Sequence, residues 1–547
     1  MRRIALLLVF VCVHCYAQKT VEEEAIMQVA GVMQMEDVGA EEVERLMELV
    51  RRPVRINHAE RRELEATGLF TPFQIASLLD YRERHGDIMS VTELSVVDGF
   101  NRQAVSALKC FLSFEADAIG RSAMRPLHGE INARTSVRIQ EGNKPEWKYG
   151  LKGKMAFGDV LKLSFSAFAP SATVAWQSGK VSLVAGDFNA RFGQGLCLWN
   201  TTVIGGLTSP SSYMRRPSGI SPSYSFSNTY SQSGIAGSLG LGNWNLTGLL
   251  HVPGIRVGDF SQLSPALNLT RYFRFGHISL TNCGSFSDIG SGYYRIPSLK
   301  SSVDASFCFN GVNVFGEAMY DYVEATPSVI AGFESSLGEK TSMASLVRYL
   351  PSSDEHGWAA SLESKGKRHT FLVSNDVLYH PSGKSLDEGR AVQVKTQAKW
   401  KWVVCDWLST ELRITERYRT WGQAYHTDAR VDLLADAGPV QITSRFNVLM
   451  CKGTGLLGYI DVQYKMNAAF KVYLRQGIFR IDNWDDRIYV YERDAPGNFN
   501  VPAFYGRGIW TSAYVSWRFA RWGSLYSRIS YKKPGRAELK LQCILHF

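Results

Sequence analysis

The sequence predicts an α + membrane β fold, in which a small N-terminal all-α domain precedes a large antiparallel transmembrane β-barrel of about 16–20 strands. Three features support this prediction: an export signal at the N-terminus, a two-residue alternation of apolar and polar side chains after about residue 128, and a last strand that ends in an aromatic residue. At 547 residues, the chain is also too long for one ordinary globular domain.

Residues 1–17 are expected to be a signal peptide. Arg2 and Arg3 precede an apolar run from Ile4 to Val13, and the small residue Ala17 marks a cleavage site. This run is too short to cross about 30 Å of hydrocarbon, and no other run approaches the roughly 18–20 apolar residues of a spanning helix. Export without spanning helices leaves a periplasmic protein, a secreted protein or an outer-membrane β-barrel.

Acidic and basic residues are divided unevenly along the chain. Residues 20–115 hold 10 Lys and Arg against 18 Asp and Glu, a net charge of −8. Residues 116–547 hold 48 Lys and Arg against 33 Asp and Glu, a net charge of +15. If part of this positive charge lines a lumen, the low-dielectric wall focuses its field and favours anionic solutes.

The acidic part of the chain, residues 20–115, contains the sequence signals for helices. Residues 18–52 are expected to form an acidic helical segment, and residues 53–115 a nearly neutral helical domain. Glycines mark the expected helix ends, at Gly68, Gly86 and Gly99. Four N-caps predict short helices near 58–66, 72–85, 91–97 and 102–111, and these caps are Asn57, Thr71, Ser90 and Asn101.

The order helix, glycine-containing hairpin, helix occurs twice in residues 53–115 and resembles the helix-hairpin-helix domain of competence-type DNA receptors. The hairpins TGLFT (67–71) and DGFNR (98–102) each keep the first glycine of that family's motif and lack the second. The resemblance implies that backbone N–H groups of the hairpins bind phosphate without reading base sequence. The residues expected to bind nucleic acid are Gly68, Leu69, Phe70, Thr71, Arg82, Arg84, Gly99, Phe100, Asn101, Arg102 and Lys109.

Residues 125–547 are predicted to form the barrel because their side chains alternate between two faces. In residues 392–404, one face is largely apolar and aromatic, and the other carries Gln393, Lys395, Gln397, Lys399 and Lys401. A soluble β-sandwich shows the same alternation, but strands of about nine to twelve residues with aromatic ends are typical of membrane barrels. At roughly 24 residues for each strand and its connection, this region would hold 16–20 strands.

The last strand ends at Phe547 and resembles the C-terminal signal that the outer-membrane barrel-assembly machinery reads. The expected location is therefore the outer membrane of a Gram-negative bacterium, with the N-terminal domain in the periplasm. The expected partners are outer-membrane lipid and the assembly machinery. Residues 201–234, which are rich in Ser, Pro and Gly, are expected to form either a long external loop or a loop folded into the pore.

Two further stretches extend the resemblance over nearly the whole chain: AGDFNARFGQGLCLWN (185–200) and DRIYVYERDAPGNFNVPAFYGRGIW (486–510). With the signal, the hairpins and the terminal aromatic residue, they resemble Bacteroidetes-type exported helix-hairpin-helix domain-containing proteins. That resemblance implies an outer-membrane location and no established activity. The charged residues of these stretches are either structural or form a network in the lumen, and they are Asp187, Arg191, Arg487, Glu492 and Arg493.

No catalytic residue, cofactor or metal site is predicted. The seven cysteines after the signal peptide are scattered, and no hydrolase or metalloprotease motif occurs, so the chain is not expected to be an enzyme. Three functions remain: a transport or channel protein for anionic cargo with the helical domain as plug or docking element, an envelope-assembly component with a periplasmic protein partner, and a nucleic-acid binding and uptake component. Residues 45–114 hold 10 basic against 9 acidic residues, and this near-neutral charge disfavours the third.

Overall fold

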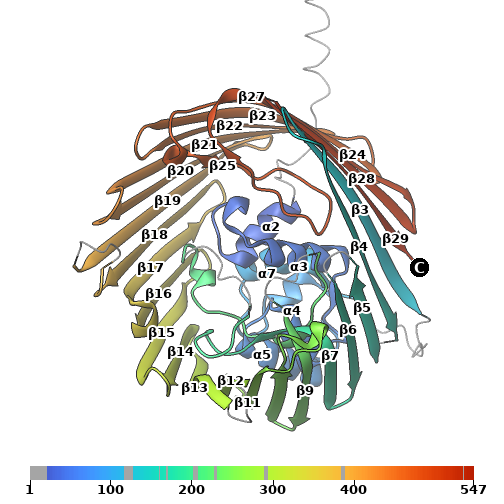
Figure 1. Cartoon of the computed structure of the whole chain (residues 1–547), viewed down its shortest axis with the longest axis vertical. Helices are drawn as coiled ribbons and strands as arrows, with labels where there is room; N and C mark the ends of the chain where they lie inside the picture. Colours follow the sequence, from blue (N-terminus) through green and yellow to red (C-terminus); the bar gives the residue numbers. More distant parts are fainter. Residues whose placement is uncertain are drawn as a thin grey trace, which may run out of the picture.

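The computed structural model describes residues 21–115, 127–158, 160–167, 170–200, 207–226, 231–288, 294–383, 389–533 and 535–547. The predicted signal peptide, residues 1–17, lies outside these ranges. A helical segment comes first in the chain, and a closed antiparallel β-barrel follows it, which confirms the predicted fold class (Figure 1).

The helical segment spans residues 21–115 and is hereafter called the plug. It contains 3-10 turns at η1 (Met35–Asp37) and η2 (Lys109–Phe111), and β1 (Val54–Arg55) pairs in parallel with β2 (Leu112–Ser113). Its α-helices are α2 (Val21–Ala30), α3 (Ala40–Arg51), α4 (Arg61–Thr67), α5 (Pro72–His85), α6 (Val91–Leu94) and α7 (Arg102–Leu108).

Three of the four predicted N-caps are confirmed by hydrogen bonds. Thr71, Ser90 and Asn101 each accept a backbone N–H from the third residue along, at 3.2, 3.1 and 2.7 Å. The prediction for Asn57 is wrong, and α4 begins later than expected. The buried Asn57 side chain instead bonds both backbone groups of Ile88, at 2.9 and 3.0 Å, and so ties the start of the domain to the loop after α5.

The barrel is built from antiparallel strands that follow one another around the ring, and it closes where β29 pairs with β3. Strand β7 pairs with both β8 and β9 along the same edge, so the short β8 does not add a place to the ring. Without β8, 24 strands of the described region complete the ring. The prediction of 16–20 strands is an underestimate. Many connections contain only two residues, so each strand with its connection takes roughly 17 residues rather than the assumed 24.

The first strands of the barrel are β3 (His128–Gln140), β4 (Glu146–Phe157), β5 (Leu161–Ser166), β6 (Ser171–Ser178), β7 (Val181–Arg191), β8 (Gly219–Pro222), β9 (Gln232–Leu241), β10 (Trp244–His251), β11 (Gln262–Phe273), β12 (Gly276–Asp288), β13 (Tyr294–Phe309), β14 (Val312–Asp321), β15 (Thr326–Leu337) and β16 (Thr341–Leu350). The remaining strands are β17 (Glu355–Lys365), β18 (His369–His380), β19 (Ala391–Cys405), β20 (Leu408–Arg419), β21 (Tyr425–Ala437), β22 (Val440–Met450), β23 (Thr454–Lys465), β24 (Phe470–Ile481), β27 (Gly506–Ala520), β28 (Gly523–Lys532) and β29 (Arg536–His546). A small hairpin of β25 (Ile488–Tyr489) and β26 (Ala503–Phe504) lies in the connection between β24 and β27.

The barrel is apolar outside and polar inside. On β23, Ile460 and Tyr464 are 53% and 46% exposed, whereas the alternate residues Asp461 and Gln463 are 4% and 2% exposed. A soluble β-sandwich has the opposite arrangement, with its apolar face buried. An outward apolar face around a closed ring is the arrangement that a lipid bilayer covers.

The plug lies inside the ring of strands, where α2, α3, α4 and α7 occupy the middle of the barrel (Figure 1). The sequence predicted this domain on the periplasmic side, as a plug or docking element; its helices lie within the lumen, as a plug does. The physical reason is charge pairing: glutamates of the helices meet basic side chains of the inner wall. No helix in the described ranges combines the length and apolarity needed to cross a membrane.

Candidate functional site

The contact between the plug and the inner wall is built largely from ion pairs. Five plug glutamates each meet a basic side chain of a barrel strand or of the inward connection 482–505. The pairs are Glu23 with Arg493, Glu24 with Lys401, Glu36 with Arg430 and Arg445, Glu44 with Lys152, and Glu48 with Lys154. The acidic segment and the basic strands of the sequence are therefore complementary surfaces.

The most buried of these contacts surrounds Glu36. Its carboxylate accepts a hydrogen bond from Arg445 Nη1 at 2.7 Å and from the backbone N–H of Tyr491 at 3.0 Å, and Arg430 Nη1 lies 3.7 Å away. Asp432 bridges the two arginines, at 2.5 Å to Arg430 and 2.8 Å to Arg445. Burial raises the pKa of Glu36, but the two arginines and the Tyr491 N–H outweigh it and lower that pKa to about 2.

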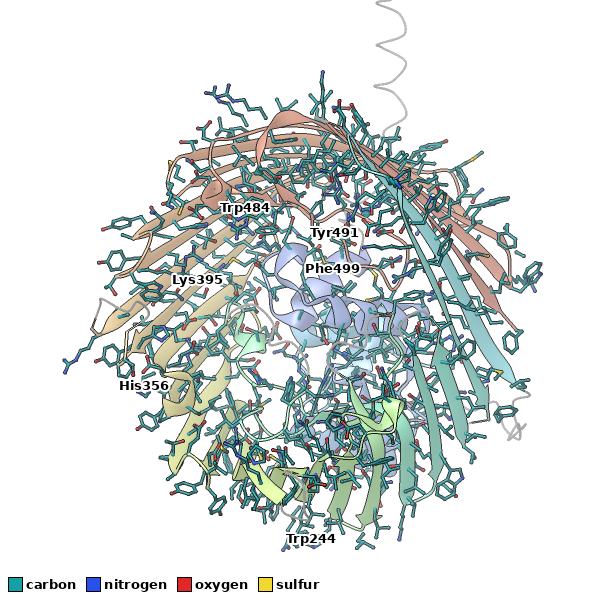
Figure 2. The ribbon with its side chains drawn as sticks, in the orientation of Figure 1. Trp244, His356, Lys395, Trp484, Tyr491 and Phe499 are labelled. Atoms are coloured by element: carbon teal, nitrogen blue, oxygen red, sulfur yellow. The ribbon has the colours of Figure 1, made fainter. Side chains whose placement is uncertain are left out.

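The hydrophobic core of the plug is its own. It includes Leu46, Ile56, Leu64 and Phe111, which are all 0% exposed. Most of its other members also come from residues 21–115. The connection 482–505 completes this core, because it folds into the barrel and packs Tyr491 and Phe499 against the plug (Figure 2). The plug thus holds together by apolar packing and meets the strands by polar contacts.

The described parts of a second connection, residues 192–200 and 207–226, also contact the barrel interior. The carboxylate of Glu317 on β14 accepts backbone N–H groups of Gln194 at 2.7 Å, Leu196 at 3.0 Å and Cys197 at 3.3 Å. Further along, Ser209 N donates to the carbonyl of Gly31 in the plug at 3.0 Å. Of the two alternatives for residues 201–234, the described part therefore follows the one folded into the pore.

The residues predicted to form a lumen network divide into separate groups. Arg493 joins Glu23 of the plug to Asp461 of β23, at 2.9 and 2.7 Å. Glu492, which is 4% exposed, accepts from Arg528 of β28 at 2.8 Å.

The other three members of the predicted set lie elsewhere. Asp187 pairs with Arg256 at 2.5 Å, and Arg191 faces Glu41 of α3 across the interface. Burial raises the pKa of Glu41, and attraction to Arg191 offsets that rise only in part. Arg487 lies near the surface and donates to Tyr489 Oη at 2.8 Å.

The predicted nucleic-acid residues are mostly engaged within the plug. Leu69, Phe70, Thr71 and Phe100 are buried. Arg82 donates to the carbonyls of Ala59 and Asn57 at 2.7 and 2.5 Å, and Arg84 pairs with Asp80 at 2.7 Å.

The hairpin backbone is engaged as well. The N–H groups of Leu69, Thr71 and Phe100 donate to Thr67 Oγ1, Gln74 Oε1 and the Val97 carbonyl. Gly68 and Gly99 have φ of 60° and 82°, so both glycines serve left-handed turns. Asn101 also donates to Ser336 of β15 at 3.1 Å, and Arg102 and Lys109 remain exposed.

The glutamate–basic pairs and the Glu317 anchor were not identified from the sequence. The alternating pattern placed Lys401 on a polar face, but it did not pair this lysine with Glu24 of the plug, 377 positions away. The only sequence signal for the interface was the opposite net charge of its two parts. Among the described residues, no group of three or more His, Cys, Asp or Glu side chains is arranged to hold a metal ion.

No known family model matches the chain, and no curated protein matches it. Among solved structures, the siderophore receptor PirA from Acinetobacter baumannii is 11% identical, with 77% of this chain and 80% of that chain covered and a TM-score of 0.41. The copper transporter OprC is 8% identical over 77% and 80%, with a TM-score of 0.42. The translocation pore of the P pilus usher PapC is 10% identical over 77% and 99%, with a TM-score of 0.33. The helix-hairpin-helix resemblance stays a prediction.

Glu36→Gln is expected to loosen the plug. The substitution leaves Arg430 and Arg445 with one buried carboxylate between them, and removing one partner of a buried ion pair costs about 3–5 kcal/mol. The folded pKa of about 2 lies below the ordinary 4.5, so this stabilisation is present above about pH 4.5 and is lost as the pH falls towards 2. Hydrogen–deuterium exchange of α2 and α3 measures the opening free energy, which should fall in the variant and should depend less on pH there.

The matched control is Glu83→Gln, the same change at an exposed position on α5. Its exchange should equal that of the wild type. Equal exchange in Glu36→Gln and the wild type would contradict a structural role for this pair.

Cys197 and Cys283 are expected to form a disulfide in an oxidising compartment. Their Sγ atoms lie 2.9 Å apart, and a disulfide needs a separation of about 2.05 Å. Each thiol loses one hydrogen, and an envelope thiol oxidant takes up the two protons and two electrons. Peptide mass spectrometry without reduction should detect the linked pair in the wild type and in the control Cys308→Ser, but not in Cys283→Ser. Complete alkylation of both thiols in unreduced protein would refute the prediction.

Proposed function

We propose that the chain is an outer-membrane transport protein whose own acidic N-terminal segment closes the barrel. The observation that carries this proposal is the set of ion pairs between plug and inner wall, from Glu23 through Glu48. A closed ring of 24 strands exceeds the size at which side chains alone fill the interior. Such a barrel conducts solutes unless something within it blocks the path.

The outer-membrane location is supported by the outward apolar face and by the connections. At the end of the barrel that holds Phe547, connections such as 310–311, 406–407 and 521–522 contain two residues. At the other end the chain forms the long inward connections 192–231 and 482–505. Outer-membrane barrels have short periplasmic turns and longer external loops, so the end with Phe547 faces the periplasm in this proposal.

The polar interface suits a plug that moves. When an apolar contact opens, its surface is exposed to water at a cost of roughly 25 cal/mol for each Å². Charged groups that separate in a wet lumen regain hydration, and this offsets much of the lost attraction. Because the apolar core lies within the plug and the connection 482–505, and not on the strands, the helices shift against the strands without unfolding.

The alternatives are an envelope-assembly role and nucleic-acid uptake. A role in assembly without a conducted substrate predicts that the barrel stays closed under all conditions. The nucleic-acid alternative has less support, because Arg82, Arg84 and the hairpin N–H groups already have partners within the plug. Arg102 and Lys109 are the exposed cations left for phosphate among the predicted set.

Weakening the plug should open the pore. The double variant Glu36→Gln/Glu44→Gln removes the carboxylates that face Arg445 and Lys152, and its opening frequency in planar bilayers should exceed that of the wild type by at least about tenfold. Deletion of residues 21–115 should give long-lived conductance.

Glu83→Gln is the control for this experiment and should behave as the wild type does. Resistance of the folded barrel to SDS at room temperature identifies protein that has folded. The double variant and the deletion of residues 21–115 decide the matter. If both insert as folded protein and neither shows stepwise conductance, the transport proposal is refuted.

Nucleic-acid binding is testable on the full chain in detergent by fluorescence anisotropy with duplex DNA. We expect no salt-dependent binding tighter than about 10 µM, because few phosphate-neutralising groups remain exposed. Tighter binding that weakens as salt rises, and that Arg102→Gln/Lys109→Gln removes, would instead favour the uptake role.

A further inference from the structure

A cavity of about 920 Å³ separates the plug from strands β19 to β22. It lies towards the end of the barrel opposite Phe547, since its lining includes the β20–β21 connection and residues of the connection 482–505. Its volume falls in the range of roughly 300–1,000 Å³ that small-molecule sites occupy. The plug therefore leaves a space large enough for a solute on one side of the lumen.

Three arginines of β20 line this cavity in a column. Arg413, Arg417 and Arg419 occupy alternate positions on the inward face of the strand, with Thr415 between the first two. Successive residues of a strand rise about 3.3 Å, so the column extends roughly 20 Å from the middle of the wall towards the external end. A solute that enters from that end meets positive charge along this whole path.

The neighbouring strands extend the positive charge sideways. Lys395 of β19, labelled in Figure 2, is the register partner of Arg417, and His426 of β21 is its partner on the other side. Side chains directly opposite each other lie about 4.5–5.5 Å apart at Cβ, and like charges in that position destabilise a strand pair. A row of cationic or titratable groups across three strands is therefore an arrangement that an anion would stabilise.

The carboxylates around this row neutralise its cations only in part: Asp428 pairs with Arg413, and Asp37 of the plug attracts Arg413 and Lys395. Asp428 accepts from Arg413 Nη2 at 3.0 Å and from Asn447 Nδ2 at 2.5 Å. Asp376, the partner of Lys395 on β18, pairs with Arg348. Asp37 of the plug accepts from Gln34 at 2.8 Å.

Several side-chain nitrogens of residues that line the cavity have no hydrogen-bond partner among the residues that the structure describes. Arg413 is 3% exposed, yet its Nε and Nη1 form no hydrogen bond there, and the same is true of Arg417 Nε and His426 Nδ1. Buried polar groups are nearly always hydrogen-bonded, because an unmet donor loses its water without compensation. Two guanidinium groups that line one cavity, each with an unmet N–H group, are the chemistry that an oxyanion pairs with.

We infer that this cavity binds a hydrophilic solute carrying two or more oxyanion groups, phosphate or carboxylate, held by Arg413, Arg417 and Lys395 with Arg419 at the entrance. This inference deepens the proposed function, because it identifies the class of cargo for the same lumen. One oxyanion bridges Arg413 and Arg417, and a second lies between Arg417 and Lys395. The carboxylate of Asp428 holds Arg413 in place on its other side.

Isothermal titration calorimetry on the full chain in detergent tests the site. The probes are inorganic tripolyphosphate for the phosphate class, citrate for the carboxylate class and a neutral trisaccharide. At least one anionic probe should bind, and the trisaccharide should not. Arg417→Gln and Lys395→Gln should each raise the Kd of that probe about tenfold, since each removes a charge-assisted contact.

Two control variants make the same chemical changes outside the cavity. Arg480→Gln and Lys148→Gln alter side chains that are 62% and 63% exposed, and both should bind as the wild type does. If neither anion binds the wild type, or if controls and cavity variants lose affinity equally, the site is refuted. The SDS-resistance assay excludes variants that fail to fold. If Arg417→Gln fails to fold, Lys395→Gln alone tests the site.

The outcomes for the site and for the proposed function are distinguishable. Anion binding that depends on Arg417, in a protein that never conducts, supports the site and refutes transport. Conductance that opens on plug removal without anion binding supports transport and refutes the site.

Discussion

The structure depends on the attraction between glutamates of the helical segment and basic side chains of the inner wall. Glu36 and Asp432 together neutralise Arg430 and Arg445 at a point where the two arginine side chains are only 5% and 10% exposed. Without the plug, these wall residues would face a lumen with one carboxylate between them. The barrel and the plug therefore complete one another electrostatically, and neither part is well satisfied alone.

This constraint explains how the connections behave. The connection 482–505 supplies Arg493 to Glu23, gives Glu492 to Arg528, and packs Tyr491 and Phe499 on the plug core. The connection 192–231 is held by Glu317 and reaches the plug through Ser209. Long connections that would otherwise lie in solvent thus become the link between wall and plug. Where they and the helices do not reach, beside β20, the wall keeps unmet donors and a cavity.

Local patterns predicted local structure well. The caps at Thr71, Ser90 and Asn101 were readable because a capping residue acts within three positions of itself. Asn57 failed the same rule because its side chain bonds Ile88, 31 residues away. The strand count was too low because turn lengths vary independently of the alternation that identifies a strand. Arg493 and Glu492 were predicted as charged residues of a network or of the wall, but their partners Glu23 and Arg528 were not, because each partner belongs to a distant element.

The sequence alone determined the fold class, the inside-out alternation of the strands and the opposite charge of the two parts. Each of these is a property of residue order and composition, so it exists before the chain folds. Only the tertiary structure decided that the helices lie within the barrel, which glutamate meets which arginine, and that Arg413, Arg417 and Lys395 converge on one open space. Those facts depend on strand register and on contacts across hundreds of residues. A two-residue period assigns a side chain to a face of the sheet, but it cannot say what that face meets.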